Sequence, residues 1–146
     1  MGRKVQNNPP LLRQKTIPAL PDLDLLTQRL HLLAEPQRSL LKMYWLKNCS
    51  VRLIAQVQKV HTQTARRQIH EWTERLLSED YIAFCRHRQL FSDEQMTVAY
   101  RRFILGEGCP RIAHHIDKSR SCTRQIVKQL EFWLSKYKED PTHLKL

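Results

Sequence analysis

Residues 112–126 read IAHHIDKSRSCTRQI, a stretch in which two apolar segments flank a polar turn. Asp117 and Lys118 interrupt the apolar pattern and predict the turn itself. Ser119 follows at once, and a serine at such a place caps a helix because its hydroxyl accepts a hydrogen bond from a free backbone N–H. The stretch therefore predicts a short helix, a tight turn and a second helix that begins at Ser119.

The apolar residues of the stretch predict how the two helices pack. A helix that is crossed closely by another needs a small residue at the crossing, and Ala113 supplies it. Apolar residues must also hold the helices together before the turn and early in the second helix. We expect this inward set to be Ile112, Ile116 and Ile126. The spacing predicts a helix-turn-helix, whose second helix enters the major groove of DNA.

The other side of the second helix is polar and basic, as a groove-reading helix requires. Arginine pairs with the O6 and N7 of guanine, glutamine pairs with adenine, and serine or lysine holds phosphates. We predict that the DNA-binding residues here are Ser119, Arg120, Ser121, Arg124, Gln125 and Lys128.

The longer stretch IAHHIDKSRSCTRQIVKQLEFWL (112–134) resembles the helix-turn-helix in the fourth region of bacterial sigma factors, and small phage regulators and antiterminators built on it. YRRFILGEG (100–108) is similar to the helix that leads into that motif. The resemblance implies that Arg120, Ser121, Arg124 and Gln125 match the positions that read the upstream promoter element. Ser121 and Lys118 depart from the family pattern, so no base preference follows. The other sigma regions have no counterpart here.

The chain repeats its pattern at an offset of 58 residues. LAEPQRSLLKMYWLKNCSVRLIA (33–55) matches FSDEQMTVAYRRFILGEGCPRIA (91–113) in apolar residues and turns, and Ile54-Ala55 falls on Ile112-Ala113. Ser92 and Gln95 form a predicted capping box at the start of the second copy. We therefore predict two related three-helix units. Their helices are expected at about 36–47, 50–58 and 62–78, and at about 92–106, 109–116 and 119–138.

The first copy, LIAQVQKVHTQTARRQIHEW (53–72), fits the motif less closely. Ala55, Val60 and Ala65 stand where the motif needs small or apolar residues. Gln58 and Gln68 fall on inward positions unless the turn contains one extra residue, and both registers stay open. In either register the outward face is Thr62, Gln63, Arg66, Arg67 and His70, which we predict to bind DNA. The alternative is a basic solvated helix.

Leu23, Leu26, Leu30 and Leu33 form one apolar stripe on a helix that begins near Asp22. Packing on a neighbouring helix is the favoured interpretation, and a coiled-coil seam that joins two chains is the alternative. The domain prediction is then an arm (1–21), a first unit with this Leu-rich helix (22–78), a linker or helix extension (79–90), a second unit (91–138) and a tail (139–146).

Charge favours a polyanionic partner. The 146 residues carry a net charge of +11, and an excess of this size is typical of proteins that bind nucleic acid or anionic membranes. Residues 36–78 carry eight Lys and Arg against two Glu, and residues 101–138 carry nine against three acids. The proline-containing arm adds Arg3, Lys4, Arg13 and Lys15, which we expect along phosphates or in a minor groove; a solubilising tail is the alternative.

Several classes of function are disfavoured. No C-x-x-C spacing occurs among Cys49, Cys85, Cys109 and Cys122, so no metal site is expected and the thiols are expected to be reduced. No Gly-rich phosphate loop, nucleophile arrangement or spaced acidic trio indicates an enzyme or a cofactor. No apolar run is long enough to cross a membrane, and no secretory signal is recognised.

Few glycines and many Leu, Gln, Arg and Lys favour helix. The sequence thus predicts an all-α protein of two tandem helix-turn-helix units behind a flexible basic arm. We expect a cytoplasmic, nucleoid-associated regulator of transcription that binds specific double-stranded DNA as a monomer or homodimer. The alternatives are an antitermination or sigma-like factor that contacts RNA polymerase, the DNA-recognition module of a recombinase or transposase, and a helical adaptor for an acidic protein.

Overall fold

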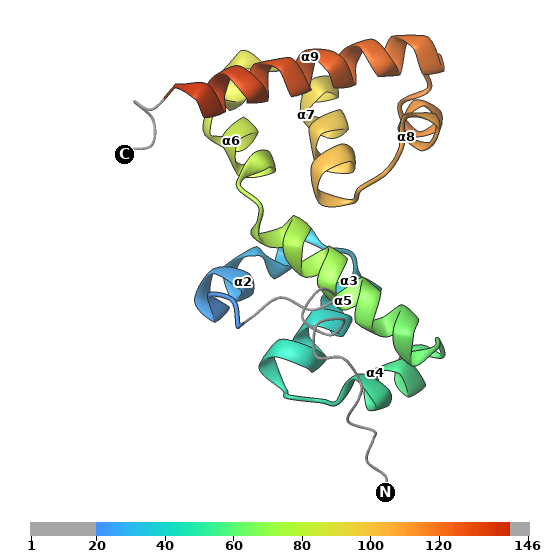
Figure 1. The fold of residues 1–146 in the computed structure, drawn as a ribbon. Helices are drawn as coiled ribbons and strands as arrows, with labels where there is room; N and C mark the ends of the chain where they lie inside the picture. The colour runs from blue at the N-terminus through green and yellow to red at the C-terminus, as the bar shows by residue number, and fades with distance from the viewer. Residues whose placement is uncertain (1–19, 141–146) are drawn as a thin grey trace, which may run out of the picture. The chain divides into compact units, whose positions relative to one another are not determined.

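The computed structural model describes residues 20–140. Between these residues the chain forms helices and no strand, which confirms the all-α fold class. The chain divides into two compact units, with the boundary between Leu77 and Ser78. We call them unit 1 and unit 2 and describe each by itself (Figure 1). The expected N-terminal arm lies almost wholly outside the described residues, and so does most of the tail.

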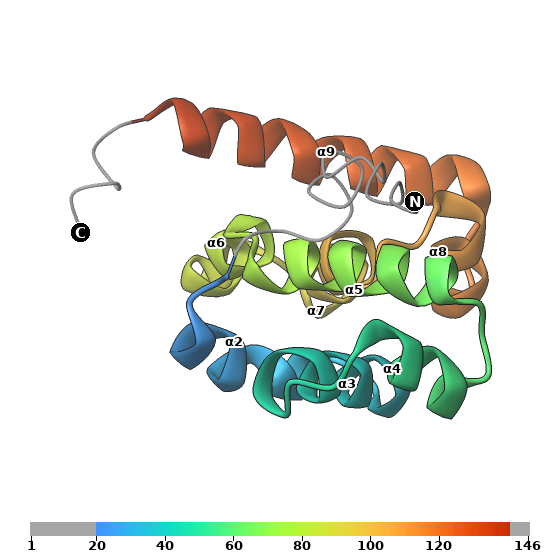
Figure 2. The ribbon, with the colours of Figure 1, turned by 60° about the horizontal axis from the view of Figure 1, so that its bottom comes forward.

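In unit 1, three shorter helices pack along one side of a long one (Figure 2). Asp22 and Ser50 cap two of the shorter helices with their side chains, and Pro36 stands at the start of a third. The elements are α2 (Leu23–Arg29), the 3-10 turn η2 (Leu30–Leu32), α3 (Glu35–Leu41), the π-helical turn η3 (Lys42–Leu46), α4 (Val51–Gln58) and the long α5 (Thr62–Leu77).

The leucine stripe of unit 1 lies inside the unit. Leu26, Leu30 and Leu33 are buried, and α2 packs against α5. The buried Arg29 donates a hydrogen bond to the carbonyl oxygen of Leu76 at 3.2 Å, which ties the start of unit 1 to the end of α5. Because these leucines are buried inside unit 1, they are not available to form the coiled-coil seam that was the alternative.

Unit 2 has the same order of elements. Ser92 and Gln95 form the predicted capping box at the start of α7: the Gln95 N–H donates to Ser92 Oγ at 3.1 Å, and the Ser92 N–H donates to Gln95 Oε1 at 2.8 Å. The elements are α6 (Asp80–Arg86), η4 (Arg88–Leu90), α7 (Asp93–Ala99), the π-helical turn η5 (Tyr100–Ile104), α8 (Cys109–Ile116) and α9 (Arg120–Glu139).

The segment 79–90, for which a linker or helix extension was expected, instead forms α6 and η4 and belongs to unit 2. Phe84 of α6 is fully buried. Its ring centroid lies 5.3 Å from the ring centroids of Phe91 and Phe103 and 5.1 Å from that of Trp133. Because this aromatic ring is buried, α6 is part of the core. The local sequence pattern does not predict this burial.

The two units match at an offset of 58 residues. From η2 and η4 onward, each element of unit 1 begins 58 residues before its counterpart in unit 2. Backbone details repeat as well: Asn48 and Gly106 both have positive φ, at 55° and 70°, and so do Lys59 and Asp117, at 60° and 58°. The offset expected from the sequence is therefore also the offset of the helices and their turns.

Candidate nucleic-acid interface

In unit 2, α8 and α9 are joined by a three-residue turn at 117–119. Asp117 adopts left-handed backbone geometry, and the Lys118 N–H donates to the carbonyl oxygen of Ala113 at 3.0 Å. Ser119 then caps α9, because its Oγ accepts from the Cys122 N–H at 3.0 Å. Thr123 adds a hydrogen bond from its hydroxyl to the Ser119 carbonyl oxygen at 2.9 Å. These bonds fix the direction in which α9 leaves the turn.

The inward side of this turn differs in part from the prediction. Ile112 and Ala113 are buried as expected, and Ile116 and Ile126 pack against the same core but are only half-buried. The fully buried residues of α9 are Thr123, Val127, Leu130 and Leu134. The core side of α9 thus centres one residue beyond Ile126.

The outward side of α9 holds all six predicted residues. Ser119, Arg120, Ser121, Arg124, Gln125 and Lys128 are exposed. The first acidic residue of α9 is Glu131, so the first three turns carry positive charge alone. None of the three cations in this group forms an ion pair with a described residue. The face therefore presents free guanidinium and ammonium groups beside polar side chains.

Arg120 lies at the N-terminal end of α9, where a cation is unusual. A helix N-terminus carries partial positive charge, so a cation in the first turn is electrostatically unfavourable within the protein. Arg120 nevertheless begins α9, and no acidic residue lies in that turn. A bound anion would offset this cost, and backbone N–H groups at a helix N-terminus suit phosphate.

Other cations of unit 2 are already neutralised. Lys118 pairs with Glu94 at 3.6 Å and Arg102 with Glu131 at 3.3 Å. Arg101 holds Glu107 at 2.9 Å. Free positive charge in this part of the unit therefore concentrates on the outward side of α9 and on the exposed Arg111 of α8.

Unit 1 places α4 and α5 around a turn of the same length, 59–61. No extra residue is inserted, so the register that needed one is not formed. Gln58 and Gln68 lie half-buried at the edge of the core, while Ala65 and Ile69 are fully buried between the helices. Two polar side chains at this edge are tolerated because they are only partly removed from water.

The outward side of α5 is less open than that of α9. Thr62, Gln63 and Arg67 are exposed, whereas Arg66 and His70 are half-buried. Glu71 lies 4.0 Å from Arg67 and 3.8 Å from Arg75, and Glu74 lies 3.3 Å from His70. The candidate residues of unit 1 thus share their face with carboxylates.

The units also differ on the exposed side of the first motif helix. Leu53 and Val57 of α4 are 43% and 56% exposed. The equivalent residues of α8 are the exposed Arg111 and His115. The helix-turn-helix pattern does not single these residues out, although the alignment of the two copies at the 58-residue offset reveals them. Unit 2 is therefore the more basic around its turn.

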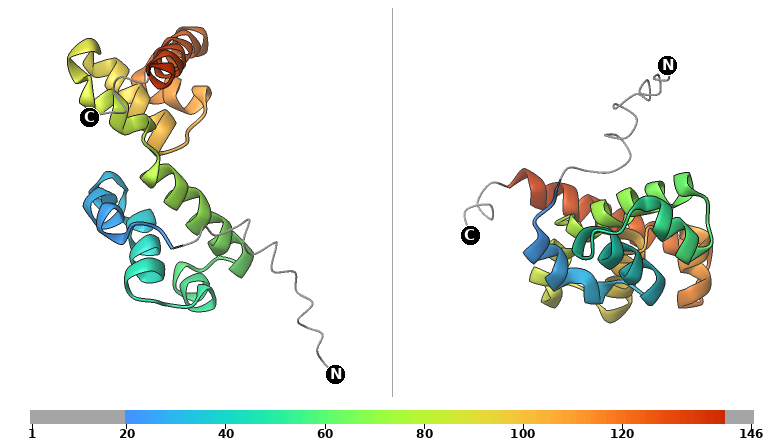
Figure 3. Two further views of the ribbon diagram at one scale, coloured as in Figure 1. Left: turned by 60° about the vertical axis from the view of Figure 1, so that its left-hand side comes forward. Right: turned by 90° about the horizontal axis from the view of Figure 1, so that it is seen from below.

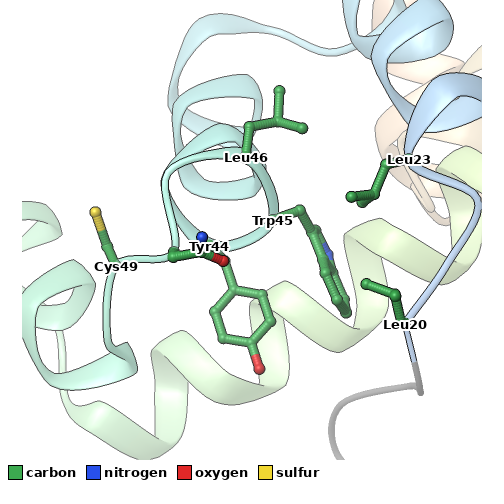
Figure 4. Close-up of a pocket in the computed structure, with 7 residues that line it drawn as sticks. Leu20, Leu23, Tyr44, Trp45, Leu46 and Cys49 are labelled. Carbon is green, nitrogen blue, oxygen red and sulfur yellow. The ribbon is translucent and has the colours of Figure 1, made fainter.

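Two hollows have linings that contain none of the predicted DNA-binding residues. One, in unit 1, has an uncharged lining in which the Trp45 ring stands between Tyr44 and two leucines (Figure 4). Its lining is Leu20, Leu23, Tyr44, Trp45, Leu46, Asn48 and Cys49. The Trp45 indole N–H donates to Thr73 Oγ1 at 2.9 Å. An uncharged hollow of this kind does not suit a polyanion.

The second hollow, in unit 2, is lined by Tyr81, Arg88, Asp93, Met96, Thr97, Tyr100, Arg101 and His115 of α8. Arg88 pairs with Asp93 at 3.8 Å, so its charge is partly met. Burial, as the larger cause, and a hydrogen bond with Cys85 raise the pKa of Tyr81 to about 12. Burial also raises the pKa of Tyr100. Both phenols are therefore uncharged near neutral pH and line the hollow as neutral groups.

Comparisons of the chain with family models, with curated protein sequences and with solved structures gave no match. Within residues 20–140, no helix has the length and apolar character needed to span a bilayer. The described residues also contain no group of three or more His, Cys, Asp or Glu side chains that could hold a metal ion. The predicted arm residues Arg3, Lys4, Arg13 and Lys15 lie outside the described residues.

Proposed function

We propose that this protein is a sequence-specific double-stranded DNA-binding regulator of transcription that uses two tandem helix-turn-helix units. One observation carries the proposal: the exposed cations at the start of α9 form no ion pair within residues 20–140 and stand on the helix that follows a three-residue turn. A helix in this position enters the major groove in helix-turn-helix proteins. The same turn recurs in unit 1.

The two kinds of contact have separate roles in this proposal. Lys128, Arg111 and the backbone at the start of α9 hold phosphates, which provides affinity without sequence information. Arg124 and Gln125 face bases, where bidentate hydrogen bonds distinguish guanine and adenine. The resemblance to the sigma-factor motif supports a role in transcription.

The central test begins with selection of bound duplexes from a random pool by the full chain. Arg124→Ala is then expected to weaken binding to the selected site by about 1–3 kcal/mol and to relax the base preference at one position, because a base-specific bidentate contact is lost. Competition binding against the selected and scrambled duplexes measures both effects.

Arg86→Ala is the matched control, since Arg86 is also exposed, lies on α6, and pairs with Glu79 at 3.6 Å. It removes the same charge and should leave base preference unchanged. If selection yields no enriched duplex, or if both variants lose affinity equally on every sequence, the proposal of sequence-specific recognition is wrong.

A further inference from the structure

The side of α9 opposite its buried residues is one continuous stripe. At 100° per residue, the positions that lie farthest from the core include Ser121, Gln125, Lys128, Phe132, Lys136 and, at the end of the helix, Glu139. All six are exposed. Phe132 lies at the centre of this outward face. Its side chain is 65% exposed, more than any other large apolar side chain described in unit 2.

No other described helix of unit 2 covers this stripe. α6, α7 and α8 all lie on the same side of α9, as two views show (Figures 1 and 3). Their contacts with α9 involve its buried side, at residues such as Val127 and Leu134. Among residues 78–140, no other element therefore covers the outward side of this 20-residue helix (Figures 1 and 3).

The surroundings of Phe132 are cationic. Lys136 Nζ stands 5.6 Å from the centroid of the Phe132 ring, and it also pairs with Glu139 at 3.7 Å. Lys128, one turn before Phe132, forms no ion pair with a described residue. An aromatic ring beside such a lysine is poorly suited to a purely apolar protein partner and well suited to a polyanion that also offers an apolar group.

Unit 1 provides an internal comparison. At the 58-residue offset, the counterpart of Phe132 is Glu74, which is exposed and lies 3.3 Å from His70, the counterpart of Lys128. Glu71 adds a second carboxylate one turn earlier. The outward side of α5 thus becomes acidic after two turns, whereas that of α9 gains an aromatic ring and carries no carboxylate before Glu139 at the end of the helix. Extended contact with a polyanion fits α9 better than α5.

We propose that Phe132 is a further specificity-determining residue, which packs against the C5-methyl group of a thymine in the major groove. The inference rests on the proposed function. The thymine methyl is the apolar feature that base pairs present in that groove. Eleven residues separate Ser121 from Phe132, a rise of about 16 Å along the helix, or about five base-pair steps. α9 therefore reads a longer stretch of duplex than α5.

The test uses the full chain and the duplex obtained by selection. Each thymine is replaced singly by deoxyuridine, which lacks only the methyl group. One replacement, toward the end of the site away from the Arg124 contact, should weaken binding by the native chain about fourfold, as expected for one buried methyl group. Phe132→Ala should weaken binding to the thymine duplex by at least that factor and should abolish the deoxyuridine effect.

Phe132→Leu should retain part of the deoxyuridine effect, because leucine still offers an apolar contact. Glu74→Ala, at the equivalent place in unit 1, should leave the deoxyuridine profile unchanged. Circular dichroism melting checks that the Phe132 variants fold, as the exposure of the side chain predicts.

The inference is overturned if Phe132→Ala binds the selected duplex as tightly as the native chain, or if its deoxyuridine profile is the same. Failure of the native chain to select any duplex would instead overturn the proposed function itself. The two failures are distinguished by whether the native chain binds its selected site.

Discussion

Two single residues set the turns of the candidate motifs. Lys59 and Asp117 both adopt left-handed backbone geometry, with φ of 60° and 58°. This geometry costs an L-residue about 1–2 kcal/mol, and aspartate tolerates it better than lysine. In return, the next N–H reaches back into the preceding helix: Val60 to Ala55 and Lys118 to Ala113, each at 3.0 Å. The turn is short because one residue reverses the chain.

At the residue scale we expect Lys59→Gly to stabilise the protein. Glycine adopts the left-handed region without a Cβ clash, and after allowance for its larger unfolded-state entropy the free energy of unfolding should rise by about 0.5–1 kcal/mol. Gln56→Gly, in the exposed middle of α4, should lower it by a similar amount. Urea unfolding measures both. A destabilised Lys59→Gly variant would contradict this turn geometry.

At the scale of elements, the start of unit 2 is the least expected feature. The stretch DYIAFCR (80–86) contains a single short apolar cluster and no proline or glycine that separates it from α5. It can therefore be interpreted as a continuation of the preceding helix. Packing decides otherwise, because Phe84 completes a cluster of aromatic rings beneath α9.

Phe84→Ala tests this assignment. Loss of a fully buried aromatic ring should lower the free energy of unfolding of unit 2 by about 3–5 kcal/mol. The adjacent Cys85 is exposed, so Cys85→Ala should have little effect. Hydrogen exchange of the α9 backbone amides, compared between the two variants, reports unit 2 separately from unit 1. Equal protection in both variants would mean that α6 does not support α9.

At the scale of the whole molecule, charge is distributed between two units that have the same elements and different surfaces. The net charge of +11 suggests nucleic acid but does not say which face binds it. Ion pairs decide that question in part, since they neutralise cations such as Arg101 and Lys118 and leave Arg120, Arg124 and Lys128 available.

Salt dependence of binding tests the whole-molecule proposal. If about six phosphates are neutralised, the logarithm of the association constant should fall against the logarithm of salt concentration with a slope of roughly −5. Replacing Arg120, Arg124 and Lys128 together by alanine should make the slope shallower by about 2–3. Filter binding between low and moderate salt measures the slope. A slope near zero would favour the helical adaptor instead.

The sequence alone determined the helices other than α6, the serine caps of α7 and α9, and the outward cations of α9. These features depend on neighbours within four residues: a serine that caps the next turn, an apolar residue at every third or fourth position. It also revealed the 58-residue repeat, because both copies need the same local pattern to form the same turns.

Only the tertiary structure decided the rest. Three features depend on residues that are distant in sequence. They are the deeper burial of Val127 than of Ile126, the place of α6 in the core, and the choice of arginines that pair with carboxylates, such as Arg102 with Glu131. The physical reason is that close packing and ion pairing are set by the shape and charge of the facing element, and a local pattern contains no information about what faces it.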